Sequence, residues 1–181
     1  MKSMNDDIKF QKKFYTQFFK FFIGMLLVAG FSSCHVYTFK DVSIPPEIKT
    51  IKLSYLDNRA TYKSPQLSSK LTDALQQKIT GQTRLTLTNS DDANYQVSGY
   101  ITNYYVSTSG ISGQQASTNR LSVGVHIDLL NTLDNSTQRF DISRDFDFSA
   151  SLTLQQAEPQ LMSDIIKNVS DEIFNRLFSN W

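Results

Sequence analysis

The chain has 181 residues, of which 18 are Lys or Arg and 17 are Asp or Glu, so its formal net charge at pH 7 is +1. No basic block interrupts this balance, and the composition therefore excludes a strongly basic nucleic-acid-binding protein. The single cysteine excludes an internal disulfide.

The first 33 residues are typical of a secretory signal peptide. Five lysines precede the apolar run Phe21–Phe31, which has 11 residues against the ~20 that a membrane-spanning helix needs. Ser32, Ser33 and Cys34 follow, so the segment resembles the lipobox of bacterial lipoproteins, although Phe31 stands where an aliphatic residue is usual. We expect Cys34 to be lipidated and to begin the mature chain. An uncleaved N-terminal anchor and an incidental cysteine are the alternatives.

The remainder of the chain has the size and polarity of one ordinary domain. Removing residues 1–33 from 181 leaves 148, with 13 basic and 15 acidic side chains. Ser, Thr, Asn and Gln make up 54 of those 148 residues, so we expect a largely neutral, hydrogen-bonding surface. Within residues 34–47, Pro45 and Pro46 exclude a helix and predict a tether that leads from the lipid to a folded domain over 48–181.

Two segments in the first half of this domain predict β-strands. Residues 48–56, IKTIKLSYL, are rich in β-formers and alternate so that Ile51, Leu53 and Tyr55 share one face. Residues 84–88, RLTLT, predict a shorter strand. Because a helix is predicted between them, these two strands should run parallel.

The helix between the two strands is predicted from its caps and its period. Ser64 can act as the N-cap with Pro65 in the first helical position, and Gly81 should follow the last turn. An apolar residue every four positions predicts a helix of about 16 residues with one buried face. The residues of that face are Leu67, Leu71, Leu75 and Ile79.

Three long segments of β character, 95–107, 121–129 and 139–148, predict an antiparallel meander, and the alternation is strict in the second of them. Between the first two, residues 108–119 are rich in Gly, Ser and Gln and predict a long binding loop. Arg144 interrupts an otherwise apolar face, and we expect it to lie at a sheet end, paired with an Asp. The residues predicted to face the core are Tyr95, Val97, Ile101, Leu121, Val123, Val125, Ile127, Leu129, Phe140, Ile142, Phe146 and Phe148.

A second amphipathic helix runs nearly to Trp181, with Pro159 in its first turn. Its apolar stripe is Leu161, Ile165, Val169, Ile173 and Leu177. Two helices must cover the single apolar face of the sheet. The predicted fold is therefore an α/β two-layer sandwich with a mixed, mostly antiparallel sheet of 4–5 strands and two helices packed on one face.

No constellation of residues typical of catalysis or of a metal site is found. His35 adjoins the expected anchor and His126 points to the polar side of a strand, and neither has a metal-ligand neighbour at a useful spacing. Asp141, Asp145 and Asp147 lie on a straight strand, whereas calcium loops need turns and Gly. We therefore expect a protein that is not an enzyme and uses no metal or cofactor.

Several segments, in this order, resemble the LptE family of lipopolysaccharide-assembly lipoproteins. They are the lipobox cysteine, SIPPEIKTIKLSYL, the Ser-Pro helix, RLSVGVHIDLLN and the terminal EIFNRLFSNW. The resemblance covers the whole mature chain and implies the same fold of a sheet with two helices on one face. It also implies an outer-membrane lipoprotein that plugs the β-barrel LptD, helps it assemble and binds lipopolysaccharide.

The resemblance does not identify ligand-binding residues, so the candidates rest on chemistry. Arg59, Lys63 and Arg120 are cations in or beside predicted loops that could meet the phosphates of lipid A. Ordinary solvated charges are the alternative for each of them. The alternative for the whole chain is a lipid-anchored periplasmic adaptor, such as an auxiliary subunit of a transporter, without lipopolysaccharide contact.

Overall fold

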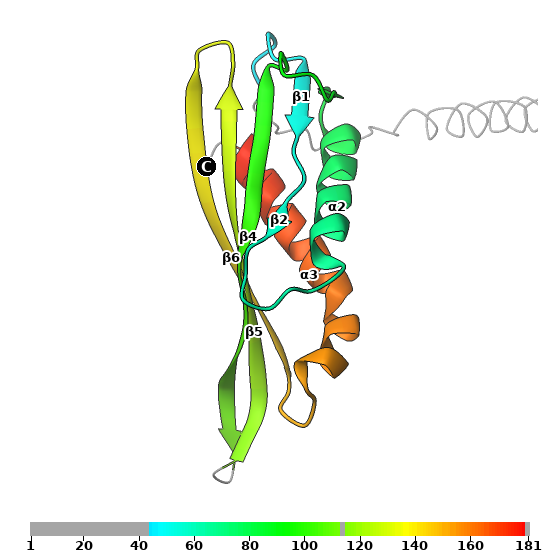
Figure 1. The fold of residues 1–181 in the computed structure, drawn as a ribbon, viewed down its shortest axis with the longest axis vertical. Helices are drawn as coiled ribbons and strands as arrows, with labels where there is room; N and C mark the ends of the chain where they lie inside the picture. The colour runs from blue at the N-terminus through cyan, green and yellow to red at the C-terminus, as the bar shows by residue number, and fades with distance from the viewer. Residues whose placement is uncertain (1–43, 113–114, 180–181) are drawn as a thin grey trace, which may run out of the picture. The chain divides into compact units, whose positions relative to one another are not determined.

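The structure, a computed structural model, describes residues 44–112 and 115–179. The elements in chain order are β1 (Thr50–Leu53), β2 (Asp57–Asn58), α2 (Leu67–Gln82), β3 (Thr86–Leu87), β4 (Tyr95–Ser112), β5 (Gln115–Asn131), β6 (Ser136–Ser149) and α3 (Leu154–Phe178). Figure 1 shows the strands in one long twisted sheet with α2 and α3 on the same side of it. The predicted two-layer α/β sandwich is confirmed.

The sheet is mixed, with the strand order β3-β1-β4-β5-β6. β1 pairs in parallel with both β3 and β4, as expected for strands that flank a helix. β4, β5 and β6 form the predicted antiparallel meander. The sheet has six strands because β2, a two-residue strand, also pairs with β4.

The first predicted strand is shorter than expected, and its alternation fails at Tyr55. Ile51 and Leu53 are buried, but β1 ends at Leu53, and Tyr55 is 57% exposed. Leu56 is fully buried in its place, and its backbone N–H donates to Thr72 of α2 at 3.2 Å. The chain leaves the sheet after Leu53, so the period of two no longer applies to the residues that follow.

Helix α2 has the predicted length and buried face but different ends. It begins after Gln66, with no side-chain cap, because the Ser64 hydroxyl donates to Glu158 of α3 instead. Gly81 lies inside the last turn, and the helix ends where the Thr83 N–H bonds the Ile79 carbonyl at 3.1 Å. The fully buried face, as predicted, consists of Leu67, Leu71, Leu75 and Ile79.

The predicted loop over residues 108–119 is wrong, because most of this segment extends β4 and β5. Thr108 pairs with Asn119, and the hairpin continues to the pair Ser112 and Gln115. In Figure 1 this extension forms the lower end of the sheet. Small polar residues of this kind are compatible with a ladder because their backbone groups still pair, whatever their side chains prefer.

A β-bulge in β4 changes which side chains face the helices. The register shifts between Ile101 and Asn103, so both Ile101 and Tyr104 are buried although three positions separate them. Opposite the bulge, a Cβ on Gly124 would lie 2.6 Å from the Thr102 hydroxyl oxygen. Only glycine allows the strands to approach this closely here.

The alternation in β5 is confirmed, since its five predicted core residues are all buried. Arg144 of β6 is not at a sheet end, and no Asp among the described residues pairs with it. It lies opposite Val123 on the side of the helices and pairs with Glu172 of α3, which also accepts from Arg176 at 3.1 Å. The apolar face is therefore interrupted by a charge that the helix layer neutralises.

Helix α3 begins earlier than predicted. Thr153 and Gln156 form a capping box, in which the Thr153 hydroxyl accepts from the Gln156 N–H and the Gln156 side chain accepts from the Thr153 N–H. Pro159 consequently lies in the second turn, inside the helix. Ile165, Val169 and the rest of the predicted stripe pack against the sheet and α2.

Candidate functional site

The side of the sheet away from the helices, called the open face below, carries polar side chains in paired positions. Arg120 lies directly opposite Asp147, and the two form a bidentate ion pair with N–O distances of 2.8 and 3.0 Å. Ser122 lies opposite Asp145 and donates to it at 2.7 Å. The hydrogen bond from Arg120 holds the pKa of the Asp147 carboxyl below its usual range.

The paired polar side chains of β5 and β6 continue toward the β5–β6 turn. His126 Nδ1 is 2.7 Å from the carboxylate of Asp141, which lies directly opposite. Arg139 lies opposite Asp128, with Nε 3.2 Å from its carboxylate. Each of the three aspartates of β6, Asp141, Asp145 and Asp147, thus has a basic or hydroxyl partner, so this face is polar with little unpaired charge.

Two further side chains join His126 on the open face. The Tyr100 ring centroid is 5.3 Å from that of His126, and the Arg59 guanidinium lies 3.9 Å from the Tyr100 ring centroid. The pKa of His126 is raised, first by its hydrogen bond to Asp141, against the opposing effect of burial, and further by the charge of Asp128. This cluster binds a proton more readily than a free imidazole does.

The structure does not bring the predicted ligand cations together. Lys63 bonds the backbone carbonyl of Asn58, near Arg59. Arg120 lies within a strand rather than beside a loop, six positions from His126, which is about 20 Å of strand. Cys34 lies outside the described residues.

A buried carboxylate joins three elements on the side of the helices. Glu158 accepts hydrogen bonds from the hydroxyls of Tyr62 at 3.0 Å, of Tyr104 at 3.2 Å and of Ser64. The rings of Tyr62 and Tyr104 stack with centroids 5.5 Å apart. Burial and the nearby Glu158 carboxylate raise the pKa of Tyr104, so its hydroxyl remains a donor. The sequence carries no local signal for this cluster, because its members are up to 96 positions apart.

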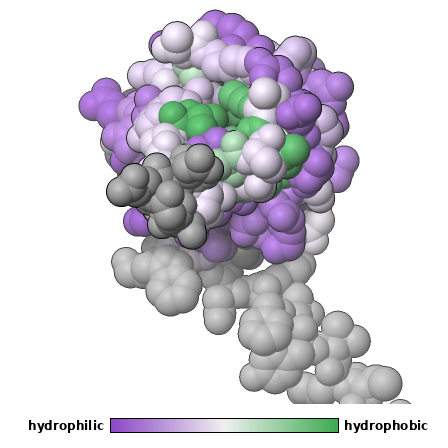
Figure 2. Space-filling model, turned by 90° about the horizontal axis from the view of Figure 1, so that it is seen from below, coloured by the Kyte–Doolittle hydropathy of each residue, from purple (hydrophilic) through white to green (hydrophobic). Residues whose placement is uncertain are grey.

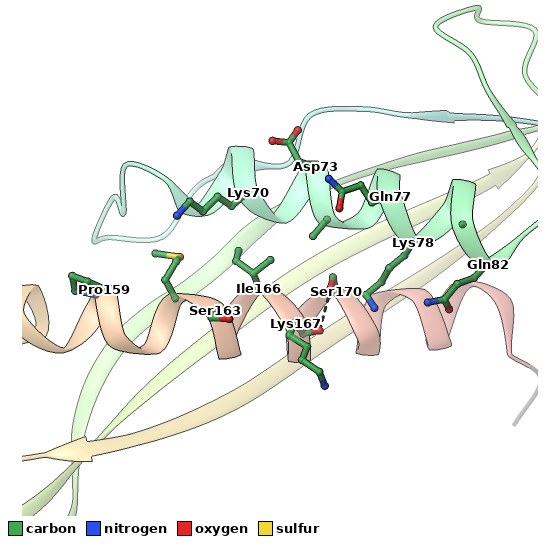
Figure 3. Close-up of a pocket in the computed structure, with 13 residues that line it drawn as sticks. Lys70, Asp73, Gln77, Lys78, Gln82, Pro159, Ser163, Ile166, Lys167 and Ser170 are labelled. Atoms are coloured by element: carbon green, nitrogen blue, oxygen red, sulfur yellow. Dashed lines mark hydrogen bonds between the residues drawn. The ribbon is translucent and has the colours of Figure 1, made fainter. Parts of the chain in front are cut away.

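Between α2 and α3 the outer surface of the helix layer is hollowed into a groove of about 810 Å³ (Figure 3). Ile166 and Met162 of α3 form its apolar part, and Lys70 and Lys78 extend from α2. At one end the groove adjoins a cavity of about 360 Å³ that reaches Glu158, and Lys70 lines both.

The end of the sheet at the β4–β5 hairpin is apolar at its centre. Figure 2 views the molecule from this end and shows hydrophobic residues surrounded by hydrophilic ones. In the register of the sheet, Val106 and Phe146 flank Leu121 on the side of the helices, and Val106 remains 38% exposed. The helices therefore do not cover the whole apolar face.

Neither a metal centre nor a membrane-spanning helix is found in the described part of the chain. Over residues 44–112 and 115–179, no three metal-ligating side chains are grouped to hold an ion. No helix within these same residues is long and apolar enough to cross a bilayer. Ser122, the hydroxyl nearest to His126 along β5, donates to Asp145 and not to the imidazole.

The fold and its surfaces define a small α/β sandwich with one packed face and one open polar face. The family model for LptE, lipopolysaccharide-assembly, matches residues 48–177. The chain therefore belongs to the LptE family, and the resemblance noted in the sequence is confirmed. No curated protein matches the chain.

Solved structures are similar to this chain at low sequence identity. A putative neuraminyllactose-binding hemagglutinin homolog from Helicobacter pylori is 11% identical, with a TM-score of 0.55 over 78% of this chain and 89% of that one. The rare lipoprotein B from Shewanella oneidensis is 15% identical, with a TM-score of 0.46 over 71% and 93%. A minor lipoprotein from Acinetobacter baumannii is also 15% identical, with a TM-score of 0.46 over 73% and 97%.

Proposed function

We propose that this protein is an outer-membrane lipoprotein, anchored through Cys34, that plugs the LptD β-barrel and assists lipopolysaccharide transport and insertion at the cell surface. The family match over residues 48–177 is the observation that carries the proposal. Its role is binding and assembly rather than catalysis. A lipid anchor would confine the domain to the membrane and raise its effective concentration at the barrel.

The open face supports docking inside a barrel. The interior of a large barrel is polar, and a plug must exchange its own hydration for contacts with that wall. The basic side chains of this face already pair with carboxylates of the neighbouring strand; they are Arg120, Arg139 and His126. Covering this face with a partner therefore leaves no isolated charge buried. Tyr105 is 55% exposed on the same face, opposite Ser122, and offers an aromatic contact.

Co-purification from membranes tests the barrel half of the proposal. LptD should co-purify with the chain, and depletion of the chain should lower the amounts of assembled barrel and surface lipopolysaccharide. Tyr105→Glu should reduce the co-purified barrel, whereas Leu133→Glu, at an equally exposed position in the β5–β6 turn, should not. If depletion leaves both barrel and lipopolysaccharide unchanged, the periplasmic adaptor replaces this function.

A separate measurement tests the ligand residues. Arg59, Lys63 and Arg120 remain our candidates for lipid A phosphates, acting as separate contacts. Replacing all three by Ala should weaken lipopolysaccharide binding most at low salt, because exposed charges are screened at high salt. Replacing only Arg59 and Lys63 by Ala leaves the Arg120–Asp147 pair in place and should retain the barrel. Unchanged lipopolysaccharide binding at low salt would remove these residues from the site.

A further inference from the structure

The groove between α2 and α3 has the dimensions and lining of a small-molecule site. Its volume of about 810 Å³ is within the range of about 300–1,000 Å³ that ligand clefts occupy. The α2 residues that line it extend from Lys70 to Gln82, about 18 Å of helix at 1.5 Å per residue. The other side of the groove is lined by α3 residues between Pro159 and Ser170, and the two helices run in the same direction. The site is therefore a long, narrow trough between two parallel helices.

The trough combines an apolar floor with charged side chains at its edge, among them Lys70, Lys78 and Asp73. Ala74, Met162 and Ile166 contribute carbon surface, and Figure 3 shows Ile166 between the two helices. Lys78 points from α2 toward α3, where it pairs with Asp171. Lys70 is exposed at the end of the trough and is in none of the ion pairs found among the described residues.

Gly81 lines the trough without filling it. It lies in the last turn of α2, where glycine is a weak helix former and where no other heavy atom lies within 4 Å of a Cβ built on its backbone. Neither close packing nor an unusual backbone conformation therefore requires glycine at this position. Any larger side chain here would project into the groove that Gly81 lines.

We propose that the groove between α2 and α3 binds an anionic amphiphile, a single alkyl chain that carries a phosphate or carboxylate head group. The alkyl chain lies along the floor formed by Ala74, Met162 and Ile166, which removes its methylenes from water. The head group lies at Lys70, whose ammonium is a compact donor suited to phosphate and carboxylate oxygens. This inference does not rest on the barrel or on the loop cations, since it uses a different surface.

The test uses hexadecyl phosphate, below its micelle concentration, and the chain carrying Cys34→Ser, so that no lipid attached at that position competes. Calorimetry should show one molecule bound per chain, and amide shifts should change around Ala74 and Ile166. Inorganic phosphate, which has no chain, and hexadecyltrimethylammonium, which has the opposite charge, should bind at least about tenfold more weakly.

Two matched pairs of variants locate the site. Gly81→Leu fills the groove and should weaken hexadecyl phosphate binding by about tenfold or more, whereas Gly81→Ala adds one methyl and should not. Lys70→Glu should weaken binding similarly, and Lys49→Glu, an exposed lysine outside the groove, should not. Circular dichroism checks that each variant is folded. No binding to the parent chain, equal binding of the ammonium probe, or undiminished binding by folded Gly81→Leu and Lys70→Glu would overturn the proposal.

Discussion

Glu158 shows how a single residue can join distant parts of the chain. Its carboxylate is buried and accepts from Tyr62, Ser64 and Tyr104, which belong to the loop before α2 and to β4. A buried carboxylate is costly unless such donors surround it, so the three hydroxyls stabilise its position in α3. They also explain why Ser64 does not cap α2.

Replacing Glu158 by Ala should lower the free energy of unfolding by about 2–4 kcal/mol, because the buried hydroxyls of Ser64 and Tyr104 and the half-buried hydroxyl of Tyr62 lose their acceptor. Tyr104→Phe removes one donor and leaves the carboxylate with two, so its loss should be about 1 kcal/mol. Urea denaturation of both variants measures the difference. Equal losses would show that Glu158 contributes no more than one ordinary hydrogen bond.

His126 predicts a specific pH dependence of stability. Its pKa in the folded chain is raised by Asp141 and Asp128, so the protonated imidazole is stabilised by folding. This contribution is complete below the unfolded pKa of about 6.5 and is lost as the pH rises through the folded value. Asp141→Asn removes the main cause and should flatten the fall in stability as the pH rises above about 6.5. Urea denaturation at several pH values tests this, and an unchanged pH profile would contradict it.

At the scale of elements, β6 is the strand most open to pairing with another chain, because it lies at the edge of the sheet next to β5. Exposed edge strands tend to pair with other chains unless charges or bulges prevent it. Arg144 is a charge on the inward side of β6, held by Glu172 of α3. The residue that interrupts the apolar pattern therefore disfavours pairing along this edge.

The register of β5 can be tested with neighbouring positions. Val125 is buried against the helices and His126 is on the open face. Val125→Asp should cost about 3–5 kcal/mol of unfolding free energy because it buries an unpaired charge. His126→Asn loses only partly exposed ion pairs and should cost less than about 1 kcal/mol. Similar thermal stability of the two variants would mean that the strand is displaced by one residue.

At the scale of the whole molecule, the two faces of the sheet have different tasks. The helices cover most of one face with an apolar core that Arg144 interrupts, and the other face remains polar along β4, β5 and β6. A domain with a single covered face can present the other to a partner without losing its own core. Attachment to a membrane would then determine which partners this face meets.

Cys34→Ser should abolish acyl labelling and leave unprocessed precursor, because we expect this thiol to be the lipid attachment point. More than one acyl chain gives stable anchoring, so the variant should also leave the membrane fraction. Mass spectrometry of the mature protein measures the modification. An unmodified Cys34 at the N-terminus or in the interior of the mature chain would refute the anchor.

The sequence by itself determined the features that depend on residues close together in the chain. Periods of four and two identified the buried faces of α2 and β5, since side-chain direction repeats along a regular backbone. The order of these elements and the single apolar face of the sheet then left a two-layer sandwich as the predicted fold. The family resemblance came from the same run of segments.

Only the tertiary structure decided which residues from distant segments meet. The acidic row on β6 gained its partners from the register with β5, and no local pattern paired Glu158 with Tyr62 or Ser64. Residues 108–112 and 115–119 became paired strand although their composition favoured a loop, because each strand satisfied the backbone groups of the other. Nothing in the sequence distinguished Arg59 from Arg120 as ligand candidates. The structure places them apart, because strand length and register, rather than residue type, determine the distance between two side chains of a sheet.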